Sequence, residues 1–299
     1  MFRNVAELVS LAEQRQVKIA EIMIRQEIEV TGLSREDVIA KMDQNLTVME
    51  QAIERGLNGV KSRTGLTGGD AVLLQNYIQS GKSLTGTLLL DAVSKAVATN
   101  EVNAAMGIIC ATPTAGSAGV VPGTLFAVKD KLNPTRQEMI EFLFTAAAFG
   151  FVVANNASIS GAAGGCQAEV GSASGMAAAA IVEMAGGTPK QSAEAMAITL
   201  KNMLGLVCDP VAGLVEVPCV KRNAMGASNA LTAADMALAG ITSRIPCDEV
   251  IGAMYAIGQS MPASLRETAE GGLAATPTGR RLEAEIFGQP KVKLIDYLV

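Results

Sequence analysis

The sequence contains no histidine and no tryptophan, and aromatic residues make up only 3% of its 299 residues. Without histidine the chain cannot supply an imidazole as a metal ligand or proton carrier, so any histidine at its site must come from another chain. Hydrophobic residues still make up 49% of the chain, so its core has to be built from Ala, Leu, Ile, Val and Met. Alternation of β-branched or aromatic residues with polar ones is scarce, and we therefore predict a mainly α protein.

The chain also lacks an excess of positive charge and a long apolar run. Its net charge of −5 and isoelectric point near 5.0 argue against nucleic-acid binding, which needs a basic surface. The longest apolar stretch, Phe142 to Ala154, is shorter than the roughly 18 residues that a membrane span needs. The residues after Met1 are polar and amphipathic, without the apolar core of a signal peptide. We therefore expect a cytoplasmic protein that binds neither nucleic acid nor membranes.

No internal repeat, low-complexity linker or shift in composition divides the chain, so residues 1–299 are expected to form one large helical domain. Ser34 is a good N-cap, and apolar residues three or four positions apart follow it as far as Gly56. The patterns predict helices over residues 4–30, 34–56, 83–107, 136–154, 172–186, 189–205, 220–240 and 247–258. The tail from Pro262 is more charged and less periodic. Its last residues, Leu294 to Val299, are expected to dock onto the body or onto a partner.

Five cysteines are an odd number, and a reducing compartment disfavours a disulfide framework. Cys166, Cys208 and Cys219 each lie close to Gly or Pro, at predicted turns where a side chain can point into a cavity. Three such thiols without histidine favour an iron–sulfur site over a zinc site. Their wide spacing does not resemble the paired cysteines of ferredoxins, so spacing alone leaves open that they are small buried core residues. Cys110 and Cys247 are predicted to be core or packing residues.

Two loops rich in glycine and hydroxyl groups are candidate anion sites. The first, residues 61–70, begins with Lys61 and matches neither the P-loop nor the dinucleotide-binding fingerprint. The second, residues 111–123, is bracketed by Pro113 and Pro122, which predict that no helix continues through it. Its hydroxyls and free amides suit a carboxylate. A tight connection between two buried helices is the alternative explanation.

Several motifs occur together and in one order along the chain. They lie at residues 64–69, 100–105, 113–119, 160–171, 205–211 and 218–223. Together they resemble the catalytic part of the bacterial iron–sulfur L-serine dehydratases, most clearly over residues 45–245. The resemblance implies a largely helical catalytic domain with a [4Fe–4S] cluster held by Cys166, Cys208 and Cys219. It also implies the deamination of L-serine to pyruvate and ammonia without pyridoxal phosphate.

Elimination of water from L-serine requires loss of the Cα proton, departure of the β-hydroxyl, and a fixed carboxylate and amino group. In this interpretation the catalytic candidates are Lys61, Ser160 and Arg222, and the substrate-binding candidates are Thr114, Gly116, Ser117, Asn155, Ser158 and Asn223. Asp209 and Glu169 are the acids nearest the cysteines, and a structural role suits them as well as a chemical one. The general base stays unassigned between Lys61, one of the serines and a histidine of a partner chain.

The end of the sequence bears on the type of enzyme. Single-chain members of the family carry a second domain, and some place a C-terminal cysteine on the open iron, whereas the last cysteine here is Cys247. The resemblance therefore implies the α chain of a two-chain enzyme, with a separate β chain as its partner. The alternatives are a cysteine desulfidase-type lyase of the same superfamily, a non-catalytic iron–sulfur redox or oxygen sensor, and a cluster-free helical subunit that only stabilises a partner.

Overall fold

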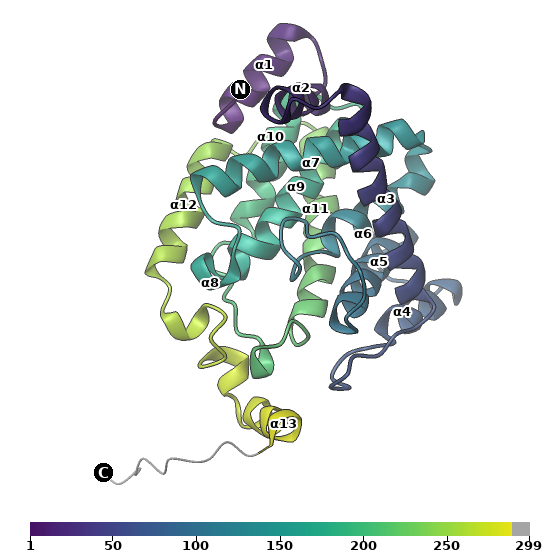
Figure 1. Ribbon diagram of the computed structural model, residues 1–299, viewed down its shortest axis with the longest axis vertical. Helices are drawn as coiled ribbons and strands as arrows, with labels where there is room; N and C mark the ends of the chain where they lie inside the picture. Colours follow the sequence, from purple (N-terminus) through teal and green to yellow (C-terminus); the bar gives the residue numbers. More distant parts are fainter. Residues whose placement is uncertain (289–299) are drawn as a thin grey trace.

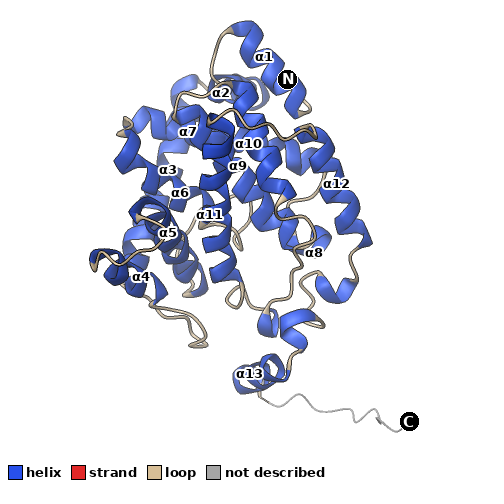
Figure 2. Cartoon of the chain, turned by 180° about the vertical axis from the view of Figure 1, so that it is seen from behind, coloured by secondary structure: helices blue, strands red, loops and turns tan. Residues whose placement is uncertain are grey.

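The computed structural model describes residues 1–288, so Leu294 to Val299 and the docking expected of them lie outside the described range. Within that range the chain is built from helices and loops and contains no β-strand (Figure 2). The mainly α prediction is thereby confirmed. The α-helices are α1 Val5–Arg15, α2 Ile19–Thr31, α3 Arg35–Leu57, α4 Asp70–Gln79, α5 Thr87–Ala104, α6 Val120–Leu132, α7 Arg136–Asn156, α8 Gly161–Gly164, α9 Ser172–Met184, α10 Pro189–Lys201, α11 Cys219–Leu238, α12 Cys247–Ser260 and α13 Pro277–Phe287.

Helix α9 lies in the middle of the molecule and packs against α6, α7, α10 and α11 (Figure 1). Its residues 172–182 are all buried, and most of them are alanine, glycine or serine, which allows neighbouring helices to approach closely. Larger side chains from the neighbours fill the remaining space, including Phe149 of α7 and Met196 of α10, which are fully buried. Burying a side chain of this size stabilises the fold by about 1.5–3 kcal/mol.

The prediction of one helix over residues 4–30 is wrong, because the chain breaks between α1 and α2. Gln16 ends α1 in a left-handed conformation with φ of 52°. The break leaves the first N–H groups of α2 without partners inside the helix. Glu183, at the C-terminal end of α9, accepts hydrogen bonds from the N–H groups of Ile19 (3.0 Å) and Ala20 (3.2 Å). The local sequence pattern could not reveal this distant cap.

Helix α4, which the sequence analysis did not predict, is also capped by a carboxylate from another helix. Its first N–H groups, from Asp70 (2.8 Å) and Ala71 (3.4 Å), donate to the carboxylate of Glu101 in α5. By contrast, α3 begins with the predicted local cap, because Ser34 Oγ accepts a hydrogen bond from the N–H of Asp37. The cap of α3 could therefore be predicted from neighbouring residues, whereas the cap of α4 could not.

The predicted loop over residues 111–123 is shorter than expected, because α6 already begins at Val120. Pro122 lies in the first turn of α6 rather than in a loop. Proline is tolerated there because the first N–H groups of a helix have no partner within the helix. Residues 111–119 stay irregular, and this part of the loop reaches the cysteine site. Helix α13, in the tail after Pro262, was also not predicted.

Helix α7 alone among residues 1–288 is long and apolar enough to cross a membrane, and 67% of its most apolar 18-residue window is buried inside the fold. It packs against α2 and α9, as the core helix of a packed protein does. The helix is not buried on all sides, because Phe151 is 36% exposed.

Candidate functional site

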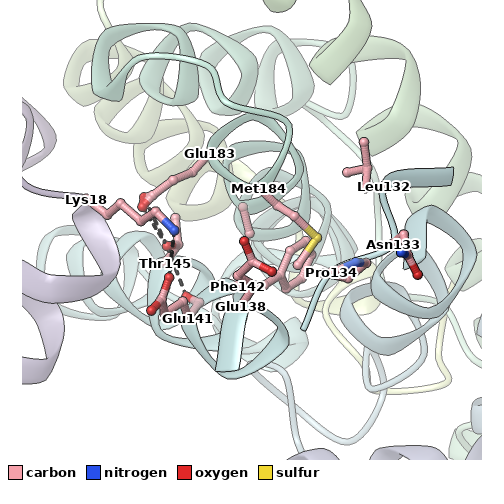
Figure 3. Close-up of a pocket in the computed structure, with 11 residues that line it drawn as sticks. Lys18, Leu132, Asn133, Pro134, Glu138, Glu141, Phe142, Thr145, Glu183 and Met184 are labelled. Atoms are coloured by element: carbon pink, nitrogen blue, oxygen red, sulfur yellow. Dashed lines mark hydrogen bonds and ion pairs between the residues drawn. The ribbon is translucent and has the colours of Figure 1, made fainter. Parts of the chain in front are cut away.

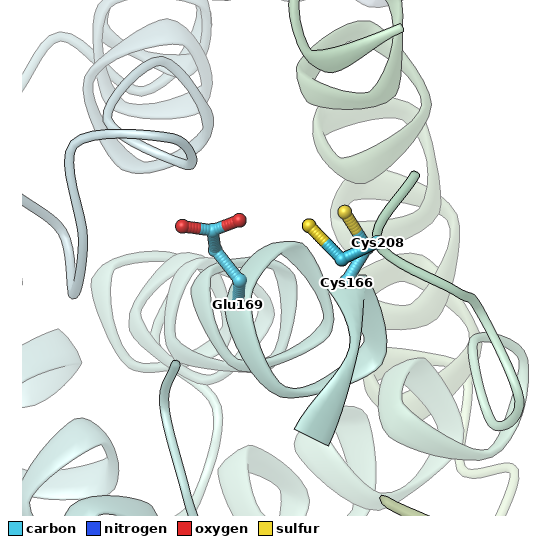
Figure 4. A group of neighbouring side chains, drawn as sticks. All are labelled: Cys166, Glu169 and Cys208. Carbon is cyan, nitrogen blue, oxygen red and sulfur yellow. The ribbon is translucent and has the colours of Figure 1, made fainter. Parts of the chain in front are cut away.

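Two of the predicted cysteine ligands lie together. Ligand atoms of Cys166, Cys208 and Glu169 all lie within 4.8 Å of one another, and all three residues are buried (Figure 4). Cys166 immediately precedes a π-helical turn, Gln167–Gly171, and Glu169 lies within it. This turn runs directly into α9. Cys208 comes from the irregular segment between α10 and α11. The fold therefore brings together groups that are far apart in the sequence.

Cys219 is the first residue of α11 and is 5% exposed, but it does not belong to that close group of ligand atoms. It lies near enough for charge on Cys166 and Glu169 to raise its pKa, in addition to the larger effect of burial. Cys166 and Cys219 both stand at the N-terminal ends of helical segments, where the helix dipole favours negative charge. The three thiols thus share one electrostatic neighbourhood.

Arg222, a predicted catalytic residue, contacts the thiol of Cys166. Its Nη1 donates to Cys166 Sγ (3.4 Å) and to the carbonyl of Val207 (2.7 Å), and its Nη2 pairs with Asp209 (2.8 Å). A hydrogen bond from Cys208 and the positive charge of Arg222 lower the pKa of Cys166. The same shared hydrogen bond, together with burial, raises the pKa of Cys208. One thiol of the pair is therefore prepared for the thiolate form that binds metals.

The 111–119 loop covers Glu169. Thr114 Oγ1 donates a hydrogen bond to Glu169 Oε1, and a β-carbon on Gly116 would lie only 2.6 Å from that oxygen. A side chain at position 116 would therefore require the carboxylate of Glu169 to move. Burial raises the pKa of Glu169. Thr114 and Gly116, both predicted to bind substrate, are thus beside the cysteine pair.

Asn223 and Ser117 hold this loop in place. Asn223 is fully buried; its Nδ2 donates to the carbonyl of Gly116 (2.7 Å), and its Oδ1 accepts from the N–H of Gly119 (3.0 Å). Ser117 Oγ donates to the carbonyl of Thr112 (3.2 Å). Asn223 belongs to α11, so its hydrogen bonds hold the loop against that helix, whereas the Ser117 contact stabilises the loop internally.

Glu267 also reaches the site, and the sequence analysis missed it. A β-carbon on Gly161 would lie 2.9 Å from Cys208 Sγ, 3.1 Å from Glu267 Oε2 and 3.3 Å from Glu169 Oε2. The backbone of Cys208 forms a short parallel bridge with Arg266 in the tail, which brings Glu267 alongside. Glu267 lies in the charged tail without helical periodicity, and no sequence spacing indicated it.

The predicted 61–70 loop is tied to the cysteine segment through Glu216, a second residue that the sequence analysis missed. Glu216 is 5% exposed and accepts hydrogen bonds from the hydroxyls of Thr64 (2.9 Å) and Thr67 (3.0 Å). Its carbonyl accepts from the N–H of Val220, in the first turn of α11. Lys61 is exposed on this loop, and within residues 1–288 no hydrogen bond joins its side chain to the cysteines.

The remaining predicted residues lie in the last turn of α7 or directly after it. Asn155 is exposed, and its Nδ2 donates to the carbonyl of Phe151 in the same helix. Ser158 Oγ accepts from the N–H of Ser160 (3.1 Å), and Ser160 precedes Gly161 at the start of α8. Ser160 is thus next to the site in sequence, whereas the side chain of Asn155 is engaged at the helix surface.

A cavity of about 120 Å³ lies elsewhere, between α2, α7 and α9 (Figure 3). Lys18 pairs with Glu141 (2.7 Å) at this cavity, and Thr145 donates to Glu183 (3.2 Å). Since Glu183 also caps α2, we interpret this cluster as structural.

The donor set at the cysteines fits an iron–sulfur cluster. All five cysteines are free, and the three predicted ligands are almost fully buried. Soft thiolates without imidazole are typical ligands of such clusters. Because residue 161 is glycine, no side chain fills the space beside Cys208 at this position.

Comparison with known proteins identifies the family of the chain. Residues 14–274 match the family model described as serine dehydratase alpha chain. The chain is 80% identical to the probable L-serine dehydratase, alpha chain, of Bacillus subtilis (strain 168), covering 96% of each chain. It is 43% identical to the L-serine dehydratase, alpha chain, of Peptoniphilus asaccharolyticus, covering 96% of this chain and 99% of the relative. It is 37% identical to the L-serine dehydratase TdcG of Escherichia coli (strain K12), where it spans 91% of this chain but 61% of the relative. The chain therefore belongs to the serine dehydratase alpha chain family.

Proposed function

We propose that this chain is the catalytic α chain of a cytoplasmic, two-chain L-serine dehydratase that converts L-serine to pyruvate and ammonia without pyridoxal phosphate. The observation that carries the proposal is the convergence of buried Cys166 and Cys208, with Cys219 in the same electrostatic neighbourhood. Family membership supports the choice of reaction, since the relatives are named L-serine dehydratases. We further propose that residues 1–299 act as one domain and that a separate β chain completes the enzyme.

In this proposal Cys166, Cys208 and Cys219 hold a [4Fe–4S] cluster. When bound, the cluster supplies a Lewis-acidic iron that makes the β-hydroxyl a better leaving group. Arg222 stabilises the Cys166 thiolate through its charge and its hydrogen bond. Asp209 holds Arg222 in place.

The 111–119 loop orients the substrate. Thr114 and Gly116 lie at the site, and we assign them to binding the substrate carboxylate together with free amides of the loop. Ser117 and Asn223 keep the loop in the position that this binding requires. Ser158 and Ser160, on the turn before Gly161, are candidates for orienting the amino group, as is Asn155. Lys61 stays a candidate for the general base. The other candidates are one of the serines of this chain and a histidine of the β chain.

The direct test is turnover by the α chain purified without oxygen and combined with its β chain. We expect pyruvate and ammonia from L-serine, and L-cysteine serves as the comparison because a desulfidase would release sulfide from it instead. Faster turnover of L-cysteine than of L-serine, or no turnover of either by protein that contains iron, would contradict the proposed reaction.

A further inference from the structure

We propose that Glu267 and Glu169 together bind the α-ammonium group of the substrate, an inference that rests on the proposed deamination of L-serine. It assigns a partner to the amino group, for which the motifs suggested only serines and Asn155. Glu267 lies in the tail segment that pairs with Cys208, and Glu169 lies on the turn that leads into α9.

The two carboxylates face the same place. Oε2 of Glu267 and Oε2 of Glu169 lie 3.1 Å and 3.3 Å from the position that a β-carbon on Gly161 would take, and Cys208 Sγ lies 2.9 Å from it. That position is one bond from the Cα of Gly161 and cannot itself hold a ligand, but it shows that the two carboxylate oxygens lie near one another. One –NH₃⁺ group lying between them can donate hydrogen bonds to both, since N–H···O bonds span about 2.7–3.2 Å. The adjacent thiol places that group next to the cluster ligands.

The pair lacks a positive partner within the described residues. Glu169 is 8% exposed; its Oε1 accepts from Thr114, and no hydrogen bond to its Oε2 is found among residues 1–288. The carboxylate of Glu267 likewise makes neither a hydrogen bond nor an ion pair within this range. Arg222, the cation beside the thiols, is already engaged by Asp209 and Cys166. Glu169 is buried and Glu267 is half-buried, and two neighbouring carboxylates repel one another, so a cationic ligand would be favourable between them.

The backbone holds Glu267 toward the site. Its φ is 65°, a left-handed conformation that is uncommon for glutamate, and Ala269 is also left-handed with φ of 58°. The N–H of Glu267 donates to the carbonyl of Cys208 (2.7 Å), and the N–H of Cys208 donates to the carbonyl of Leu265 (2.8 Å). Uncommon conformations held by surrounding contacts occur often at functional sites. The segment that carries a predicted cluster ligand therefore also fixes the carboxylate.

The experiment uses Glu267→Gln in the cluster-loaded two-chain enzyme. Glu270→Gln is the matched control, because Glu270 is an exposed glutamate on the same segment. Two non-reacting ligands distinguish binding of the amino group from binding of the rest of the substrate. L-alanine keeps the α-ammonium group, and L-glycerate replaces it with a hydroxyl. Their dissociation constants are measured by calorimetry, and iron content and the absorption spectrum are recorded for each variant.

We expect Glu267→Gln to raise the KM for L-serine and the dissociation constant of L-alanine about tenfold, and to change that of L-glycerate less than about twofold. Iron content and spectrum should match the wild type, as should every property of Glu270→Gln. Glu169→Gln should show the same selectivity between the two ligands, and it provides the test if Glu267→Gln does not fold.

Three results would overturn the inference: equal weakening of both ligands, no weakening of L-alanine, or loss of iron in the variants, which would make the carboxylates metal ligands instead. Failure of the proposed function is distinguishable, because the wild type would then not deaminate L-serine. Normal wild-type turnover with unchanged L-alanine binding in Glu267→Gln would contradict the ammonium-binding inference and leave the proposed function intact.

Discussion

Two glutamates differ in the partners that surround them: Glu183 lies at the C-terminal end of α9, and Glu169 lies on the helical turn that leads into α9. Glu183, at the C-terminal end of α9, accepts hydrogen bonds from two N–H groups of α2 and from the hydroxyl of Thr145 (Figure 3). Glu169, on the turn before α9, accepts a hydrogen bond from one hydroxyl and lies beside the thiols of Cys166 and Cys208 (Figure 4). The carboxylate of Glu267 is also close to it. Burial raises the pKa of both.

The comparison separates structure from function. At Glu183 the fold supplies donors for the buried carboxylate, so the group stabilises the packing of α2 on α9. At Glu169 the fold brings further negative groups instead, which is unfavourable unless a positive ligand binds. Sites for chemistry are often stabilised less well than the core that carries them.

The largest effect is expected at the thiols beside Glu169. Cys166→Ala, Cys208→Ala and Cys219→Ala should each abolish iron binding and reduce L-serine turnover to background, because three thiolates are needed to hold the cluster. Cys110→Ala is the control and should retain both, since the Cys110 thiol contacts the carbonyl of Asn45 in α3 and is not in the close group of ligand atoms. Iron analysis and a pyruvate assay decide the matter, and iron that survives all three ligand changes would rule out the assignment.

A smaller but still local effect is expected at Gly161. Gly161→Ala places a methyl group 2.9 Å from Cys208 Sγ and against both carboxylates. We expect at least a roughly tenfold loss of turnover, with a change in unfolding free energy below about 1.5 kcal/mol.

Gly252→Ala is the matched control for Gly161→Ala. Gly252 lies within α12, and a β-carbon there would meet no atom within 4 Å. This variant should keep full turnover and gain about 0.5–1 kcal/mol of stability from better helix propensity. Equal activity of the two glycine variants would show that the space beside Cys208 is not part of the site.

The smallest effect on activity is expected at Glu183. Glu183→Ala should leave turnover of the folded enzyme near the wild-type value but lower the free energy of unfolding by about 2–3 kcal/mol, because it leaves helix N–H groups unpaired. Glu169→Ala should show the reverse pattern, with low turnover and stability within about 1 kcal/mol of the wild type. Denaturant unfolding of the metal-free chain measures both, and a larger stability loss at Glu169 would contradict the comparison.

The pH dependence of stability sharpens the contrast at Glu183. Its pKa in the folded chain is raised above the ordinary value of 4.5, mainly by burial. The folded state therefore holds the proton more tightly than the unfolded chain, and stability falls as the pH rises from 4.5 through the raised pKa. The stability difference between wild type and Glu183→Gln should accordingly shrink as the pH rises from 4.5 through the raised pKa of Glu183. A stability difference that grows as the pH rises would contradict the raised pKa of Glu183.

The sequence predicted features that depend on neighbouring residues. The helical class followed from composition, and Ser34 indicated the start of α3. The three cysteines were marked by nearby glycine and proline. Features that depend on distant contacts were missed: the break at Gln16 is matched by a cap from Glu183, and α4 depends on Glu101.

Within the site the same distinction applies. Arg222 and the 111–119 loop were predicted from motifs and lie against the thiols and Glu169. Glu216 and Glu267 were not predicted, because their contacts arise only when the 61–70 loop and the tail fold onto the segment around Cys208. Neither residue belongs to a local pattern that reveals such a contact.

The central claim is that three buried thiols of this chain hold an iron–sulfur cluster. Iron and acid-labile sulfide per chain, measured in protein purified without oxygen, test it most directly. The account predicts about four of each, as a [4Fe–4S] cluster requires. Neither iron nor sulfide, even after anaerobic reconstitution, would contradict it and would leave Cys166, Cys208 and Cys219 as core residues.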